Sequence, residues 1–126
     1  MDFAPTTEQN QLRTEVRALA RSFTYDYWYE RDRTATYPWE FVNAFAKAGW
    51  LGMIIPEEYD GGGASCVDAA LMLKEVAASG AGASGASAVH FYMFPPMPII
   101  KYGSAEMKAR VLPSVCLLYT SDAADE

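Results

Sequence analysis

The 126-residue sequence has no cluster of lysine or arginine, no long apolar run, and very few cysteines or histidines. The formal net charge is −6, and the lack of a basic patch argues against nucleic acid or an anionic membrane surface as a partner. No apolar run approaches the roughly 20 residues of a membrane-spanning helix. The N-terminus also lacks the basic-then-apolar order of a secretory signal. We therefore expect a cytoplasmic protein with no membrane span and no nucleic-acid partner.

The residues that usually bind metals or form disulfides are scarce. Two cysteines, Cys66 and Cys116, do not make a disulfide framework or a metal site. His90 is the only histidine, and no second ligand stands at a metal-binding spacing from it. We therefore expect no metal and no catalytic role for His90, and we expect Cys66 to be a small buried residue.

The composition is that of one globular domain, with 51% hydrophobic and 21% charged residues. No segment alternates apolar and polar residues with a period of two, which strands would require. The sequence therefore predicts an all-α fold, a bundle of about five helices.

The first half of the chain predicts two helices. Thr6 and Gln9 fit a capping box, and apolar residues follow at helical spacing, so the first helix is expected from about Thr7 to Trp28. A second helix is expected from near Pro38 to Ala48, with Gly49 in a left-handed turn after its end.

The middle of the chain predicts an apolar crossing, a loop and a third helix. Residues 50–56 form the short crossing, and Glu57–Gly63 form a tight loop. Ser65, with Asp68 three residues later, marks a helix start, and this helix is expected to finish by Ser79 and Gly80.

The last part of the chain predicts two further helices. Residues 80–85 fit either a linker or a helix start, and a fourth helix is expected over Ala86–Phe94. A short helical turn is expected over residues 97–103. The last helix, Ala105–Leu112, is capped by Ser104 and stopped by Pro113.

The glycine-rich loop invites comparison with a phosphate-binding loop. No Lys-Ser/Thr pair follows Gly61-Gly62-Gly63, and the spacing is not that of a dinucleotide fingerprint. A structural turn is therefore the favoured interpretation. The neighbouring Glu57 and Glu58 are expected to be solvated and not an acid–base pair.

Three motifs resemble the N-terminal domain of the acyl-CoA dehydrogenase family in order and spacing. They are Thr7-Glu8-Gln9-Asn10-Gln11-Leu12-Arg13; Gly49-Trp50-Leu51-Gly52 with Ile55-Pro56-Glu57-Glu58-Tyr59; and Pro98-Ile99-Ile100 with Gly103-Ser104-Ala105-Glu106, Lys108 and Leu112-Pro113. The resemblance covers Phe3 to Val115.

The sequence departs from the family at two places. Asp60 replaces the first glycine of a pair, and aspartate is among the residues that tolerate a left-handed conformation. Residues 116–126 resemble the in-frame translation of a transposase-type sequencing-library adapter. We expect residues 1–115 to be the domain and residues 116–126 to be an artefactual tail.

The resemblance implies a function that this chain alone does not complete. Members of the family remove hydrogen across the α and β carbons of acyl-CoA thioesters with FAD, pass electrons to an electron-transfer flavoprotein, and usually form tetramers. The family's catalytic base and main flavin contacts lie in later domains, so the fragment is expected to be inactive alone, with no catalytic or cofactor-binding residue. Acyl-CoA oxidases, flavin monooxygenases and a stand-alone helical interaction module remain alternatives.

Two aromatic residues are candidates for substrate contact. The resemblance implies that residues 90–94 help form the far wall of the acyl-chain cavity. Phe91 and Phe94 lie three apart and would share a helix face. They are either wall residues that shorten the cavity or ordinary core aromatics.

Overall fold

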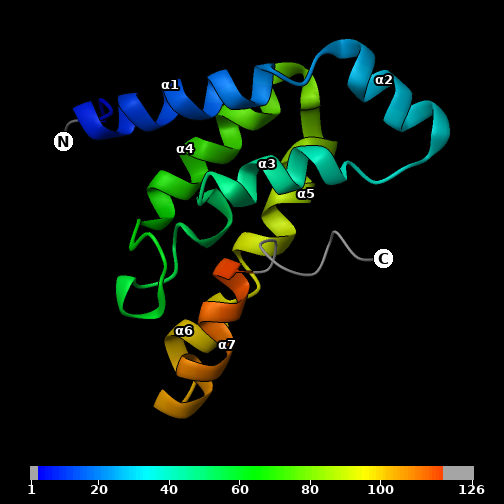
Figure 1. Cartoon of the computed structure of the whole chain (residues 1–126). Helices are drawn as coiled ribbons and strands as arrows, with labels where there is room; N and C mark the ends of the chain where they lie inside the picture. The colour runs from blue at the N-terminus through cyan, green and yellow to red at the C-terminus, as the bar shows by residue number, and fades with distance from the viewer. Residues whose placement is uncertain (1–2, 118–126) are drawn as a thin grey trace.

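The computed structural model describes residues 3–117, which form helices and turns with no strand among them (Figure 1). This confirms the all-α prediction, and each of the five segments predicted as helical contains an α-helix. The α-helices of this part of the chain are α1 Thr7–Arg21, α2 Tyr25–Thr34, α3 Trp39–Lys47, α4 Cys66–Val76, α5 Gly82–Met93, α6 Met97–Tyr102 and α7 Ala105–Leu117.

Two reciprocal capping boxes begin α1 and α4, as the sequence predicts. The Thr6 hydroxyl accepts from the Gln9 backbone N–H at 3.2 Å, and the Gln9 side chain accepts from the Thr6 N–H at 3.0 Å. Ser65 and Asp68 make the same exchange at the start of α4. Gln9 Nε2 also donates to Asp68 Oδ1 at 3.0 Å, so the two helix starts are tied together.

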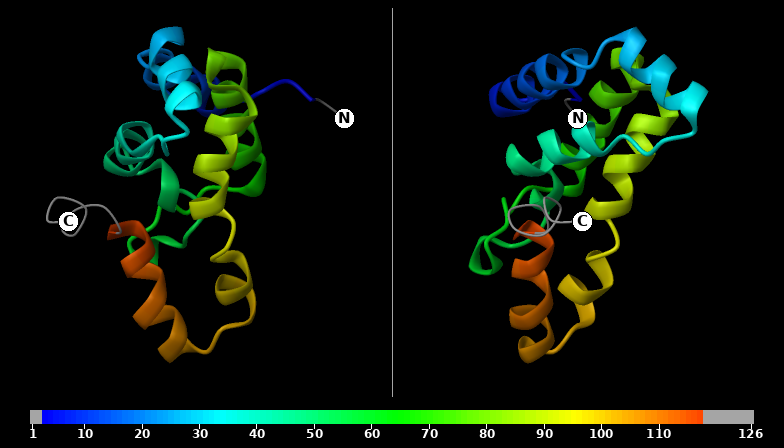
Figure 2. Two further views of the ribbon diagram at one scale, coloured as in Figure 1. Left: turned by 90° about the vertical axis from the view of Figure 1, so that its right-hand side faces the viewer. Right: turned by 45° about the vertical axis from the view of Figure 1, so that its right-hand side comes forward.

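The prediction of one helix over residues 7–28 is wrong, because α1 ends at Arg21 and a separate helix, α2, begins at Tyr25. The Ser22 hydroxyl bonds the Leu19 carbonyl at 2.6 Å, and Thr24 has an extended backbone that starts α2. Serine and threonine compete for backbone hydrogen bonds in this way. The new direction carries α2 away from α1 and toward α5 (Figures 1 and 2).

The core lies where α1, α3, α4 and α5 meet. Fifteen buried side chains form it, and an aromatic group of Phe23, Trp28 and Phe41 packs along one side with ring centroids 4.8–5.1 Å apart. Buried apolar area of this kind is the main stabilising contribution in a small domain. The buried residues are Val16, Ala20, Phe41, Val42, Phe45, Leu51, Met53, Ile54, Ala69, Met72, Val76, Ala81, Ala88, Val89 and Met93.

The segment between α3 and α4 has the predicted form. Gly49 has a φ of 83°, and a short 3-10 helix, Trp50–Gly52, leads into the buried residues 51–55. A second 3-10 helix, Glu57–Tyr59, ends at Asp60, whose φ of 68° confirms that aspartate tolerates the left-handed position. Glu57 and Glu58 are exposed, as expected.

A π-helical turn, Ala77–Ala81, joins α4 to α5, with a kink at Gly80. Residues 82–85 therefore begin α5, which settles the open choice between linker and helix start. Cys66 is exposed at the first position of α4, so the expectation that it is buried is wrong. Cys66 is the first residue of α4, and the buried residues of this helix begin only at Ala69.

Helices α6 and α7 form an arm that extends from the end of α5 (Figure 2). The expectation that Pro113 stops the last helix is wrong, because α7 continues to Leu117. An interior proline removes one helical hydrogen bond, but the turns on both sides of it are packed. Leu112 is fully buried, and the Cys116 thiol lies 3.8 Å from the Tyr59 carbonyl oxygen. Residues 118–126, most of the expected tail, lie outside the described residues.

Candidate functional site

A cleft of about 600 Å³ lies between α2 with its following loop and the exposed face of α5. The wall on the α5 side consists of Ala81, at the end of the π-helical turn, and Ser84, Ser87, Ala88 and Phe91 of α5. The opposite wall consists of Trp28, Arg31, Asp32, Ala35, Thr36, Tyr37 and Pro38. The α5 side of the cleft therefore has small side chains and one ring, that of Phe91. The opposite side has two rings together with charged and polar groups.

The end of α2 turns the chain so that residues 35–38 can form the second wall. Ala35 adopts a left-handed conformation with a φ of 51°, and its N–H donates to the Asp32 carbonyl at 3.2 Å. The N–H of Thr36 donates to the Arg31 carbonyl at 3.0 Å. This pairing resembles the helix end that glycine usually makes, so Ala35 holds a strained backbone at the edge of the cleft.

Tyr37 connects the loop to α5. A side-chain hydrogen bond with Tyr92 and burial of the phenol together raise the pKa of Tyr37 above its ordinary value, burial being the larger cause. Its ring also lies edge-on to that of Trp39, with centroids 4.6 Å apart. This hydrogen bond links the loop after α2 to α5 next to Phe91.

The structure separates the two candidate aromatic residues. Phe91 lines the cleft and is 69% exposed. Phe94 follows the last residue of α5, is partly buried against the core, and does not line the cleft. The His90 ring is near both, with its centroid 5.8 Å from that of Phe91 and 5.0 Å from that of Phe94. Contact of either ring with an acyl group stays a prediction.

The ionisable groups of the cleft are of opposite sign. Arg31 Nη1 lies 3.7 Å from Glu40 Oε1, and the guanidinium lies 5.4 Å from the centre of the Tyr27 ring. Asp32 lines the same wall. No histidine or cysteine lines the cleft, and its polar lining consists of Arg31, Asp32, Tyr37 and the hydroxyl groups of Thr36, Ser84 and Ser87.

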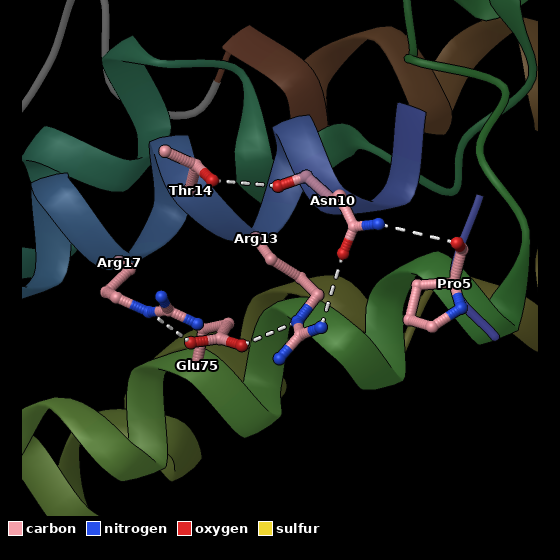
Figure 3. A network of polar contacts seen from close by, with 6 residues as sticks. All are labelled: Pro5, Asn10, Arg13, Thr14, Arg17 and Glu75. Carbon is pink, nitrogen blue, oxygen red and sulfur yellow. Dashed lines mark hydrogen bonds and ion pairs between the residues drawn. The ribbon is translucent and has the colours of Figure 1, made fainter. Parts of the chain in front are cut away.

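Sequence reasoning missed the one buried charge among the described residues, Glu75 of α4, which is 4% exposed. Its two oxygens accept from Arg13 Nε at 2.7 Å and Arg17 Nε at 2.8 Å, and both arginines come from α1 (Figure 3). The bond from Arg17 is the largest cause that lowers the pKa of Glu75 to about 2. A carboxylate held this acidic is a structural ion pair and a poor base near neutral pH. The signal was available, since Arg13 and Arg17 are one helical turn apart.

The glycine-rich loop does not fit a nucleotide phosphate. A Cβ on Gly61 would collide with the Ile55 backbone, and a Cβ on Gly62 would lie 2.9 Å from the Met53 carbonyl oxygen. The glycines therefore permit close packing of the loop against its own chain. No group of three side chains that could hold a metal ion occurs among the described residues.

The sequence matches the family profile described as acyl-CoA dehydrogenase, N-terminal domain, over residues 6–117. The chain belongs to the acyl-CoA dehydrogenase family. The match includes α1–α7, and therefore both walls of the cleft. In the described part of the chain, no helix has the length and apolar character needed to cross a membrane.

Curated relatives are 30–38% identical to this acyl-CoA dehydrogenase domain over the aligned residues. A probable acyl-CoA dehydrogenase, fadE25 of Mycobacterium leprae, is 38% identical over 108 residues, which are 86% of this chain and 27% of that protein. The 3-sulfinopropanoyl-CoA desulfinase of Paraburkholderia xenovorans is 35% identical over 123 residues, 91% of this chain and 31% of that protein. The chain thus spans under a third of the length of these relatives.

The fold is shared with a solved structure. A chain from the structure described as the electron transferring flavoprotein of Acidaminococcus fermentans superposes with a TM-score of 0.80. The superposition covers 92% of this chain and 30% of that one, at 24% identity. At this identity the likeness concerns the fold alone.

Proposed function

We propose that the chain is the N-terminal, acyl-contacting part of an FAD-dependent enzyme that dehydrogenates acyl-CoA thioesters across their α and β carbons. The family match over residues 6–117 carries this proposal. The 38% identity to a probable acyl-CoA dehydrogenase supports the reaction type. We assign no catalytic residue to this chain.

The part that this chain plays is to bound one side of the acyl site. Phe91 is a large apolar side chain left 69% exposed beside a cleft, and burying it against an acyl group would be favourable. The complete protein would form a homotetramer, act in the cytoplasm and pass electrons to an electron-transfer flavoprotein. FAD would supply the hydride acceptor, held by residues outside this chain.

A chimeric enzyme tests the proposal. Residues 6–117 would replace the matching segment of the M. leprae relative, and turnover of straight-chain acyl-CoA substrates would be measured with a dye as electron acceptor. We expect bound FAD and a kcat/KM within about tenfold of the parent, since a transplanted wall changes binding by a few contacts. A folded, FAD-containing chimera without turnover on any acyl-CoA would contradict the proposal.

A second candidate is a different reaction on an acyl-CoA. The 35% identity to a 3-sulfinopropanoyl-CoA desulfinase favours it, because that relative matches almost the same length of chain. Release of sulfite from 3-sulfinopropanoyl-CoA by the chimera, in place of dehydrogenation, would support this candidate. A stand-alone interaction module would instead be supported if the chain alone unfolded cooperatively and eluted as a monodisperse species while the chimera failed to assemble.

A further inference from the structure

We propose that the cleft between α2 and α5 selects acyl groups that end in a flat, uncharged ring, in preference to straight alkyl chains. The proposal rests on the proposed function for the thioester part of the substrate, and on the cleft itself for the ring.

Three aromatic side chains from three segments line the one cleft. They are Trp28 of α2, Tyr37 of the following loop and Phe91 of α5. Tyr37 and Phe91 are 40% and 69% exposed, so much of their ring surface is available to a ligand. Aromatic rings prefer offset-stacked or edge-to-face contact with another ring, and such contacts add to the gain from burial alone.

Trp28 and Tyr37 are held in place before a ligand arrives. The Trp28 ring lies 4.8 Å from that of Phe41, and its six-membered ring packs on Gly85, where a Cβ would lie 3.3 Å from Cη2. Tyr37 is held by its hydrogen bond with Tyr92 and by the Trp39 ring. Binding surfaces that need no ordering lose less affinity to conformational entropy.

The α5 wall leaves room for a ring beside Phe91. Ser84, Ser87 and Ala88 precede Phe91 on the same face, and their side chains are small. From Ser84 to Phe91 this wall is about 10 Å long at the helical rise. Phe91 is the largest side chain of this wall, and there the ring of an acyl group would meet an aromatic face.

The charges of the cleft favour an uncharged ligand. Arg31 and Asp32 are the ionisable groups of opposite sign on the α2 wall, and Arg31 also lies near Glu40. One charge of each sign leaves this wall without a net charge that would attract a charged ligand. Hydroxyl groups of Ser84, Ser87 and Thr36 can bond to a polar substituent on the ring.

A direct binding experiment tests the preference on the full 126-residue chain. The indole N–H signals of Trp28, Trp39 and Trp50 would be followed by NMR during titration with methyl 3-phenylpropanoate or methyl octanoate. We expect a saturable shift of the Trp28 signal, with about fivefold tighter binding of the phenyl ester, since an aromatic contact contributes a factor of this order. Equal or tighter binding of methyl octanoate, or no saturable shift with either ester, would overturn the proposal.

A matched pair of variants identifies the cause. Phe91→Leu keeps an apolar side chain but removes the flat face, and should weaken binding of the phenyl ester about fivefold while leaving methyl octanoate unchanged. Tyr25→Leu is the control, because Tyr25 is 78% exposed and does not line the cleft. If Phe91→Leu binds the phenyl ester as tightly as the wild type does, the inference is wrong.

The two proposals can fail separately. An active chimera together with no ring preference in the titration removes the ring inference alone. Ring preference together with a chimera that binds FAD but lacks turnover removes the dehydrogenase proposal and leaves the cleft as a ring-binding site.

Discussion

Glu75 of α4 and Arg17 of α1 form a 2.8 Å ion pair in which the carboxylate is buried and the guanidinium reaches it from the surface. Arg13 completes the arrangement on the other oxygen at 2.7 Å. The two helices are 58 or more residues apart in sequence at these contacts. The pair of arginines therefore fixes how α1 lies on α4, and so helps position the start of α2 and the cleft beyond it.

Removing both arginines leaves a buried carboxylate without a partner. We expect Arg13→Ala with Arg17→Ala to lower the free energy of unfolding by about 3–5 kcal/mol, the usual cost of an uncompensated buried charge. Urea denaturation followed by circular dichroism measures this. The control is Arg33→Ala, whose exposed pair with Glu30 should contribute at most about 1 kcal/mol. Equal effects of the two changes would contradict the burial argument.

The same carboxylate makes stability depend on pH. The folded pKa of Glu75 is lowered from 4.5 to about 2, so its contribution is fully present above pH 4.5 and is lost as the pH falls toward 2. Glu8, Glu40 and Asp68 also have lowered pKa values. The difference in unfolding free energy between the wild type and Glu75→Gln isolates the Glu75 contribution. This difference should shrink between pH 4.5 and 2, and a constant difference would refute the assignment.

Local sequence signals predicted the elements whose causes are local. The capping boxes at Thr6 and Ser65, the turn at Gly49 and the left-handed Asp60 all follow from residues within four positions. The break after Arg21 and the continuation of α7 through Pro113 did not follow. In α7, the packing of Leu112 and Cys116 outweighs the helix-breaking tendency of proline.

The residues of the candidate site show the same contrast between local signals, which the sequence carries, and tertiary contacts, which it does not. The sequence placed Phe91 and Phe94 on one segment, but the tertiary fold decides which ring meets a cleft. Phe91 is opposite residues of α2 and its loop, which the sequence did not predict as a separate helix. Glu75 was missed because its partners are distant in sequence, although the charged residues themselves were visible.

The backbone strain at Ala35, at the end of α2, should be removed by glycine. Ala35→Gly should raise the unfolding free energy by about 0.5–1 kcal/mol, because glycine adopts a φ of 51° without steric cost. Ala48→Gly is the matched control at the end of α3, where the backbone is right-handed and glycine should destabilise by a similar amount. Thermal unfolding of the two variants measures both, and the same sign for both would contradict this interpretation.

The two phenylalanines within residues 90–94 should differ in their effect on stability. Phe94→Ala should cost at least about 1 kcal/mol, because its ring is packed against the core. Phe91→Ala should change stability by about 0.5 kcal/mol or less, since the side chain is 69% exposed. Chemical denaturation compares them, and an equal loss would show that Phe91 also belongs to the core.

The central claim is that this domain supplies an acyl-contacting wall through Phe91, and the acyl-chain profile of the chimeric enzyme tests it most directly. We would compare kcat/KM for straight-chain acyl-CoA substrates of increasing length in the chimera, in its Phe91→Ala variant and in its Tyr25→Ala control. Removal of the Phe91 ring should move the optimum about two carbons longer, because each methylene in a pocket changes selectivity measurably. The control should keep the original optimum. Identical profiles for the chimera and its Phe91→Ala variant would contradict the account.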